Sequence, residues 1–316
     1  TDLTLARVDQ LADISLKHGI NTTLSPLFVD RNNAAGAQKI VERVAERTAR
    51  GARVWPQVQT RPIDISFNFS VPSLLFVRLP KWYALMRFNE PEQIMANLKD
   101  QNTRDTLIAE AQGMMPLWNN LVLRQVVSEA NQELVGKTLK EIAALRQSDA
   151  LNVMIDLSLE ESLEAHFLSA DMGHNDDALV APLLKHPNVM IGASDGGAHI
   201  LSFATYGDTG YLLGHFVRDT AHLGLEAAVK KITADPANLW GMGNRGMLRE
   251  GFIADITVFD ESVVDRGAEY FVQDVPGDGY RYVRDAHGIH SVVIGGALAY
   301  DKANGYYEAH RGQVIG

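Results

Sequence analysis

The chain has 316 residues, of which 29 are Lys or Arg and 39 are Asp or Glu, so its formal net charge is −10. Hydrophobic residues make up 46% and charged residues 22%, a composition typical of a globular protein and not of a disordered one. The acidic balance argues against a nucleic-acid partner or an anionic membrane surface, since both require clustered cations.

The chain contains no cysteine, which excludes disulfides, a thiol nucleophile and cysteine-ligated metals. No apolar run approaches the roughly 18 residues of a transmembrane helix, and no signal peptide is visible. We therefore expect a cytoplasmic protein that has no membrane partner.

The first sixty residues alternate between helical and strand patterns. Apolar spacing predicts helices over 3–17 and 34–49, and β-forming runs predict strands over 22–28 and 53–59. Such alternation is typical of parallel strands joined by helical crossovers. The sequence therefore predicts an α/β fold.

The alternation breaks over 61–147, where prolines and aromatic residues punctuate helical stretches, and we predict a mostly helical insertion there. The aromatic residues of 67–88 form either the core of this insertion, which we favour, or a lid over an apolar substrate. A buried strand is then predicted over 152–157 and a helix over 159–170.

Another apolar strand is predicted over 189–195, followed by helices near 209–222 and 225–240. From residue 248 onward the pattern alternates in strand fashion, with a strand over 251–260 and, over 290–300, two strands joined by a Gly-Gly turn. We therefore divide the chain at residue 247, with a small β domain over 248–316.

Asp195 is the strongest candidate for chemistry. It follows an apolar strand and precedes two glycines, and the carboxyl ends of parallel strands line active sites in α/β proteins. A carboxylate there binds a metal or acts as a general base, unless it only accepts backbone hydrogen bonds within a tight turn.

Other polar residues are weaker candidates. His199 lies close enough to Asp195 to bind substrate or metal, or it pairs locally within a loop. The strand predicted over 53–59 ends with Gln57 and Gln59, and Arg61 follows it. These side chains either face a polar pocket or form hydrogen bonds with neighbouring backbone. His174, with two acidic residues after it, has a metal-like composition, although a solvated polar loop is the favoured interpretation.

Two further histidines, His215 and His222, share a face of a predicted helix, and we expect surface or packing roles for them. Phosphate-loop, dinucleotide-binding, HExxH and GxSxG motifs are all absent from the sequence.

Linked motifs in the C-terminal third carry a resemblance to a known family. After Asp195 come the segments 225–229 (LEAAV), 233–241 (TADPANLWG), 245–260 (RGMLREGFIADITVFD) and 292–296 (VVIGG). Together they resemble the end of amidohydrolase-superfamily enzymes, most of all the N-acyl-D-amino-acid deacylase (D-aminoacylase) group.

The resemblance implies a metal-dependent (β/α)₈ TIM barrel with a flanking β-sandwich. The strands over 22–28, 53–59, 152–157 and 189–195 would be barrel strands five to eight, so the chain would be the C-terminal half of the barrel. The N-terminal half would be supplied by a preceding segment of the same gene product or, less simply, by a second chain. We expect that residues 1–316 do not fold stably alone, because a half barrel leaves bare strand edges.

Many members of the family carry a metal-ligating histidine at the ends of strands five and six, but the corresponding segments here, 25–28 and 56–59, contain none. These segments argue against a binuclear site of the usual kind and leave open a single divalent metal, with zinc the first choice. Asp195 would be both the metal ligand and the catalytic base, and His199, Gln57 and Arg61 would bind substrate.

The implied activity is hydrolysis of a linear amide in a small molecule such as an N-acyl-D-amino acid. The alternatives are a non-catalytic or divergent homologue without the usual metal ligands, and a hydrolase of cyclic amides or imides. The sequence leaves a homo-oligomer open.

Overall fold

The N-terminal part forms a parallel α/β layer, as the alternating pattern predicts. This computed structural model describes residues 1–29, 31, 34–192, 194, 196–204, 206–277, 279–308 and 312–314. The helices and strands predicted over 3–59 recur, although the strand predicted over 22–28 is shorter. The first elements are α1 (Asp2–His18), β1 (Thr22–Leu24), α2 (Ala34–Ala49) and β2 (Val54–Val58).

Helix α1 ends where the sequence suggests, at Gly19. This residue has a left-handed φ of 66°, and its N–H bonds the Ser15 carbonyl. Glycine adopts that conformation without steric cost, so the chain can reverse into β1.

A third parallel strand, β6 (Met190–Ile191), follows α9 (Asp177–Lys185) and completes a sheet of order β1-β2-β6. Val54 and Val58 are buried on the face of β2 that packs with α1, α2 and α9. Trp55 and Gln57 alternate with them and lie on the opposite face, which is only half-buried.

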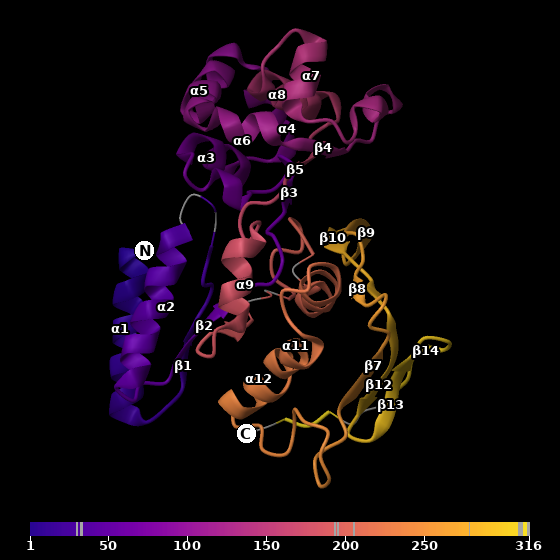
Figure 1. The fold of residues 1–316 in the computed structure, drawn as a ribbon. Coiled ribbons are helices and arrows are strands. Elements are labelled where there is room, and N and C mark those ends of the chain that lie inside the picture. The colour runs from indigo at the N-terminus through magenta and orange to yellow at the C-terminus, as the bar shows by residue number, and fades with distance from the viewer. Residues whose placement is uncertain are drawn as a thin grey trace.

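The insertion lies between β2 and α9 and forms the upper part of the molecule in Figure 1. Its elements are β3 (Ile65–Phe67), η2 (Leu74–Phe76), α3 (Pro80–Phe88), α4 (Pro91–Lys99), α5 (Gln101–Ala111), η3 (Gln112–Met114), α6 (Met115–Asn120), β4 (Val122–Gln125), η4 (Glu129–Leu134), α7 (Leu139–Arg146), α8 (Ala150–Glu160) and β5 (His166–Ser169). The insertion also contains an antiparallel sheet of order β3-β5-β4. The sequence pattern did not predict this sheet.

The insertion has a hydrophobic core of its own, built around aromatic rings. Phe76 is fully buried and lies 5.1 Å from the ring of Phe67 and 5.3 Å from that of Trp82. The interpretation as core is therefore confirmed for the buried rings of Phe67, Phe69, Phe76 and Trp82, but not for Phe88, which is exposed.

The predicted strand over 152–157 is wrong, because these residues lie in helix α8. Asp149 caps this helix by accepting the N–H groups of Leu151 and Asn152. The apolar side chains of α8 are buried on nearly all sides of the helix. A continuous apolar run of this kind lacks the periodicity that distinguishes a helix from a strand in sequence. The helix expected over 159–170 is likewise replaced by the end of α8 and by strand β5, so the insertion continues past residue 147.

The C-terminal part begins with helices and ends in strands (Figure 1). Its elements are α10 (Asp208–Tyr211), η5 (Leu212–Asp219), α11 (Leu225–Ile232), α12 (Ala234–Leu239), β7 (Ile256–Phe259), β8 (Asp265–Arg266), β9 (Tyr270–Val275), β10 (Gly279–Val283), β11 (Ala286–His287), β12 (Ile289–Ile294), β13 (Ala297–Asp301) and β14 (Gly305–Tyr306). No helix follows residue 248 in the described part of the chain, in agreement with the sequence pattern.

The principal C-terminal sheet is antiparallel and has the order β14-β13-β12-β7. Strands β12 and β13 form the expected hairpin, whose turn consists of Gly295 and Gly296 with φ values of 56° and 82°. Glycines suit such a turn, since it requires positive φ at both central positions. Among the described residues, no helix is both long and apolar enough to cross a membrane.

Replacement of Phe76 by alanine is expected to destabilise the insertion by about 3–5 kcal/mol, because it opens a cavity in the buried aromatic cluster. Phe88→Ala is the matched control, since Phe88 is 74% exposed, and it is expected to change stability by less than about 0.5 kcal/mol. Urea unfolding of the full-length natural protein measures both variants. Equal losses would contradict the assignment of the aromatic cluster as the core of the insertion.

Candidate functional site

Strands β1 and β2 run towards the insertion in Figure 1, and β6 runs parallel to β2, so all three strands end on that side. The chain leaves β2 at Val58 and returns through a close pairing of Ile63 with Met172 and Gly173. The insertion therefore leaves and rejoins the α/β layer beside the carboxyl end of β2. Active sites of parallel α/β proteins lie at this end of the sheet.

Arg61 lies just beyond the end of β2 and is 2% exposed. Its Nε donates to Asp208 Oδ2 at 3.3 Å, and its Nη2 donates to the Ser194 carbonyl at 3.4 Å. Thr60 Oγ1 also donates to the Asp208 carbonyl, at 2.8 Å. Arg61 therefore ties the end of β2 to the loop after β6 and to the start of α10.

Asp195, the predicted catalytic and metal-binding residue, lies outside the described residues. The flanking residue Ser194 is held by Arg61, and Gly197 follows with a φ of 93°. The role assigned to Asp195 stays a prediction.

His199 is exposed and has a left-handed φ of 55°. Its ring stacks on Phe203, with 5.6 Å between the ring centroids, and the Arg61 guanidinium lies 6.0 Å from that same ring. Two of the predicted substrate-binding residues thus meet around Phe203.

Gln57 lies on the open face of β2, where its Nε2 donates to Thr23 Oγ1 of β1 at 2.9 Å. Gly192 lies against it, since a Cβ on that glycine would come within 2.4 Å of Gln57 Oε1. Gln59 is buried, with 5% of its surface exposed. Gln57 therefore lies between β1 and the residue that follows β6.

The histidine that the sequence analysis assigned to a solvated loop is in fact buried. His174 is 2% exposed, and its backbone N–H donates to the Val29 carbonyl at 2.8 Å. Its ring packs edge-on against Phe28, with 5.4 Å between the ring centroids. Burial, assisted by the positive charge of Arg61, lowers the pKa of His174 to about 4, so its imidazole is neutral at neutral pH. Composition alone could not reveal this burial, because the contacts come from a segment far away in the chain.

A second polar group approaches from the C-terminal strands. The Arg266 guanidinium lies 4.5 Å from the centre of the Tyr211 ring, and its buried Nη1 has no hydrogen-bond partner among the described residues. Burial lowers the pKa of Arg266, as do the neighbouring charges of Arg284 and Arg61. Burial raises the pKa of Asp64 and brings that of Tyr211 to about 12. Arg266 carries no recognisable motif, so sequence reasoning missed it.

His215 and His222 both approach Asp177 at the start of α9. The His215 Nε2 lies 2.8 Å from Asp177 Oδ2, and the His222 Nε2 lies 3.9 Å from the same atom. The His215 ring also stacks on Tyr211 at 4.7 Å, which agrees with the packing role expected for it.

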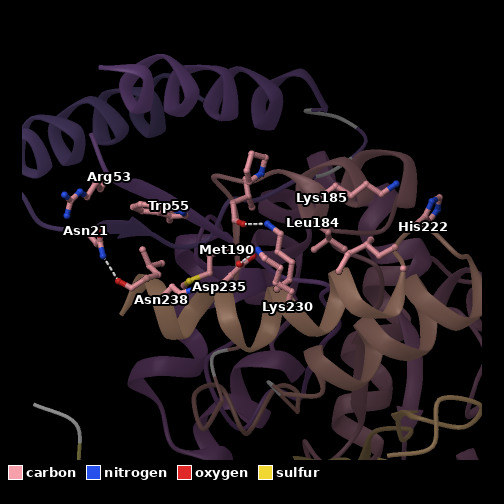
Figure 2. A pocket seen from close by; sticks show the side chains of 17 residues that line it. Asn21, Arg53, Trp55, Leu184, Lys185, Met190, His222, Lys230, Asp235 and Asn238 are labelled. Carbon is pink, nitrogen blue, oxygen red and sulfur yellow. Dashed lines mark hydrogen bonds and ion pairs between the residues drawn. The ribbon is translucent and has the colours of Figure 1, made fainter. Parts of the chain in front are cut away.

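A cavity of about 840 Å³ lies near the amino ends of the strands and not near their carboxyl ends (Figure 2). Asn21, Arg53 and Val189, at the starts of the three strands, line it together with residues of α11 and α12. Its place in the fold argues against the active site, since catalytic groups of parallel α/β proteins gather at the opposite end of the sheet.

A complete metal site is not assembled by the described residues, among which no three His, Asp or Glu side chains converge. The buried imidazole of His174 lies beside the Phe28 ring and the Arg61 cation, so it does not make a metal site by itself.

Comparison with known proteins identifies the family. The protein-family model described as "Amidohydrolase family" matches residues 96–300, which is more than half of the chain. The chain therefore belongs to the amidohydrolase family.

Two curated relatives come from Alcaligenes xylosoxydans xylosoxydans. D-aminoacylase is 31% identical over 185 residues, which cover 58% of this chain and 34% of the relative. N-acyl-D-glutamate deacylase is 32% identical over 185 residues, covering 57% of this chain and 34% of the relative.

Solved structures share the fold. N-acyl-D-glutamate deacylase from Bordetella bronchiseptica, complexed with zinc and a phosphonate inhibitor, superposes with a TM-score of 0.53 at 21% identity, covering 95% of this chain and 52% of that one. A structure of D-aminoacylase gives a TM-score of 0.53 at 20% identity, covering 97% of this chain and 52% of that one. The chain thus spans about half the length of the solved relatives.

Replacement of Asp208 by asparagine is expected to cost about 3–5 kcal/mol of stability, because it leaves the buried Arg61 cation without its counter-charge. Asp219→Asn is the control, since Asp219 makes an exposed ion pair with Arg218 and is expected to contribute little. Urea unfolding distinguishes them. Similar small losses in both variants would show that Arg61 does not depend on Asp208.

Proposed function

We propose that this protein is a metal-dependent hydrolase that cleaves a linear amide, with an N-acyl-D-amino acid or a similar N-acyl compound as substrate. The observation that carries the proposal is the amidohydrolase-family match over 96–300, with deacylases among the relatives. The polar groups gathered at the carboxyl ends of β2 and β6, Arg61 among them, support the proposal.

The three parallel strands would belong to a (β/α)₈ barrel whose remaining strands come from a preceding segment. Support comes from the sheet itself, in which helices cover one face while Trp55 and Gln57 on the other face are half-buried. The coverage of 52% of the solved relatives agrees with this arrangement. The C-terminal strands would form part of the flanking β-sandwich.

The substrate carboxylate would bind beside a cluster of arginines. Arg61 uses its donors on Asp208, Ser194 and Pro62, whereas Arg266 Nη1 has no acceptor among the described residues. A buried guanidinium donor with no acceptor favours a carboxylate ligand, since charge-assisted hydrogen bonds are the stronger ones. Arg61 would act mainly by fixing the loop after β6.

In the reaction, water adds to the acyl carbon, the C–N bond breaks, and a carboxylate and a free amine leave. Asp195 would accept the proton of the water and return it to the leaving nitrogen. A bound divalent metal would supply Lewis acidity to the amide carbonyl. His199, which is exposed and stacks on Phe203, would contact the substrate. Gln57, on the open face of β2, would line the substrate-binding site.

Asp195→Asn in the full-length natural protein is expected to lower the turnover of N-acyl-D-amino acids at least about 10²-fold, since it removes the general acid–base group. The assay follows amine release from matched D and L substrates and from a cyclic amide, with and without a chelator. Asp219→Asn serves as the control and is expected to leave turnover unchanged.

Near-normal turnover of Asp195→Asn would contradict the role of Asp195. Hydrolysis of the cyclic amide alone would replace the linear-amide assignment. A wild-type protein that cleaves none of the substrates would favour a non-catalytic homologue.

A further inference from the structure

The loop after β6 (192–207) is anchored by other parts of the chain. The Tyr282 N–H of β10 donates to the Ile200 carbonyl at 2.9 Å, and the Ser66 N–H of β3 donates to the Ser202 carbonyl at 2.7 Å. One anchor therefore comes from the insertion and the other from the C-terminal strands. The position of this loop depends on both.

A third anchor of the loop is a buried carboxylate. The side chain of Glu269, which directly precedes β9, is 8% exposed, and its Oε2 accepts the backbone N–H of the buried residue Ala204. His199, earlier in the same loop, has a left-handed φ of 55°. Such a conformation is strained in a non-glycine residue and persists only where the surrounding structure holds it. The Glu269 carboxylate thus holds the segment that presents His199.

Two arginines stabilise the Glu269 carboxylate in this place. Arg124 of β4 donates from Nη1 to Glu269 Oε1 at 2.6 Å, and Arg284, which follows β10, donates from Nη2 to Oε2 at 3.2 Å. These charge-assisted hydrogen bonds offset the cost of burying the carboxylate. A neutral residue at position 269 would leave both arginines without their shared counter-charge and would weaken the hold on the Ala204 N–H.

We propose that Glu269 is a positioning residue for the hydrolytic reaction. It acts through the loop after β6 by setting where His199 lies, and it does not itself touch the substrate. The inference rests on the proposed function, in which His199 contacts the substrate. The hold of Glu269 on the loop can nevertheless be measured without any assay of activity.

The test compares Glu269→Gln with wild type in the full-length natural protein. A carboxamide cannot accept hydrogen bonds from both arginines, so the loop is expected to loosen and the Ala204 amide to exchange hydrogen at least about tenfold faster. For N-acyl-D-amino acids, kcat/KM is expected to fall at least about tenfold, because small displacements of a substrate-positioning group are costly. Part of this fall is expected as a raised KM, since the displaced His199 contacts the substrate less well.

The rise in KM separates positioning from general destabilisation. A smaller folded fraction lowers the apparent kcat but leaves KM unchanged. Asp274→Asn is the matched control, because Asp274 accepts two hydrogen bonds from Arg281 at the exposed surface of the same hairpin. This variant is expected to keep wild-type exchange, kcat and KM.

Wild-type exchange of Ala204 together with a wild-type KM in Glu269→Gln would overturn the proposal. Should Glu269→Gln fail to fold, exchange in the wild-type protein decides, since an unprotected Ala204 amide would also overturn it. If wild type hydrolyses no N-acyl compound while Glu269→Gln still speeds the exchange of Ala204, the proposed function fails and the hold of Glu269 on the loop is supported.

Discussion

The buried ion pair of Arg61 and Asp208 joins three segments that are distant in sequence. Arg61 follows β2, Asp208 begins α10, and the Ser194 carbonyl that Arg61 also holds belongs to the loop after β6. Both side chains are more than nine-tenths buried, so each would carry a large desolvation cost without the other. The pair therefore fixes the position of the end of β2 relative to the loop after β6 and to α10. These segments make up much of the candidate site.

The insertion depends on the same junction. It has its own aromatic core, yet it enters and leaves within a few residues of Arg61, where Ile63 pairs with Met172 and Gly173. A further link joins the Ser66 N–H to the Ser202 carbonyl, in the loop that carries His199 and Phe203. The insertion is thus attached to the site at its base, and the loop that closes it carries His174 against Phe28.

Local pattern predicted the elements whose two faces differ. Helices α1 and α2 and strand β2 have one buried and one open side, so their periodicity could be read from the sequence. Helix α8 was taken for a strand because it is buried nearly all round, and the short strands β3 and β5 were missed because their pairing is long-range.

The candidate site could be predicted only where it follows strand ends. Arg61 and His199 were found in this way, and the structure brings both to Phe203. The partner Asp208, the unsatisfied donor of Arg266 and the burial of His174 arise from tertiary contacts, which no local pattern encodes.

Anomalous diffraction at the zinc edge, from crystals of the full-length protein grown with zinc, is the most direct measurement. The expected result is a peak at the carboxyl ends of β1, β2 and β6, with an Asp195 carboxylate oxygen about 2.0–2.2 Å from the metal. A peak at the cavity near the amino ends of the strands, with none within bonding distance of Asp195, would contradict both the metal ligand and the location of the active site.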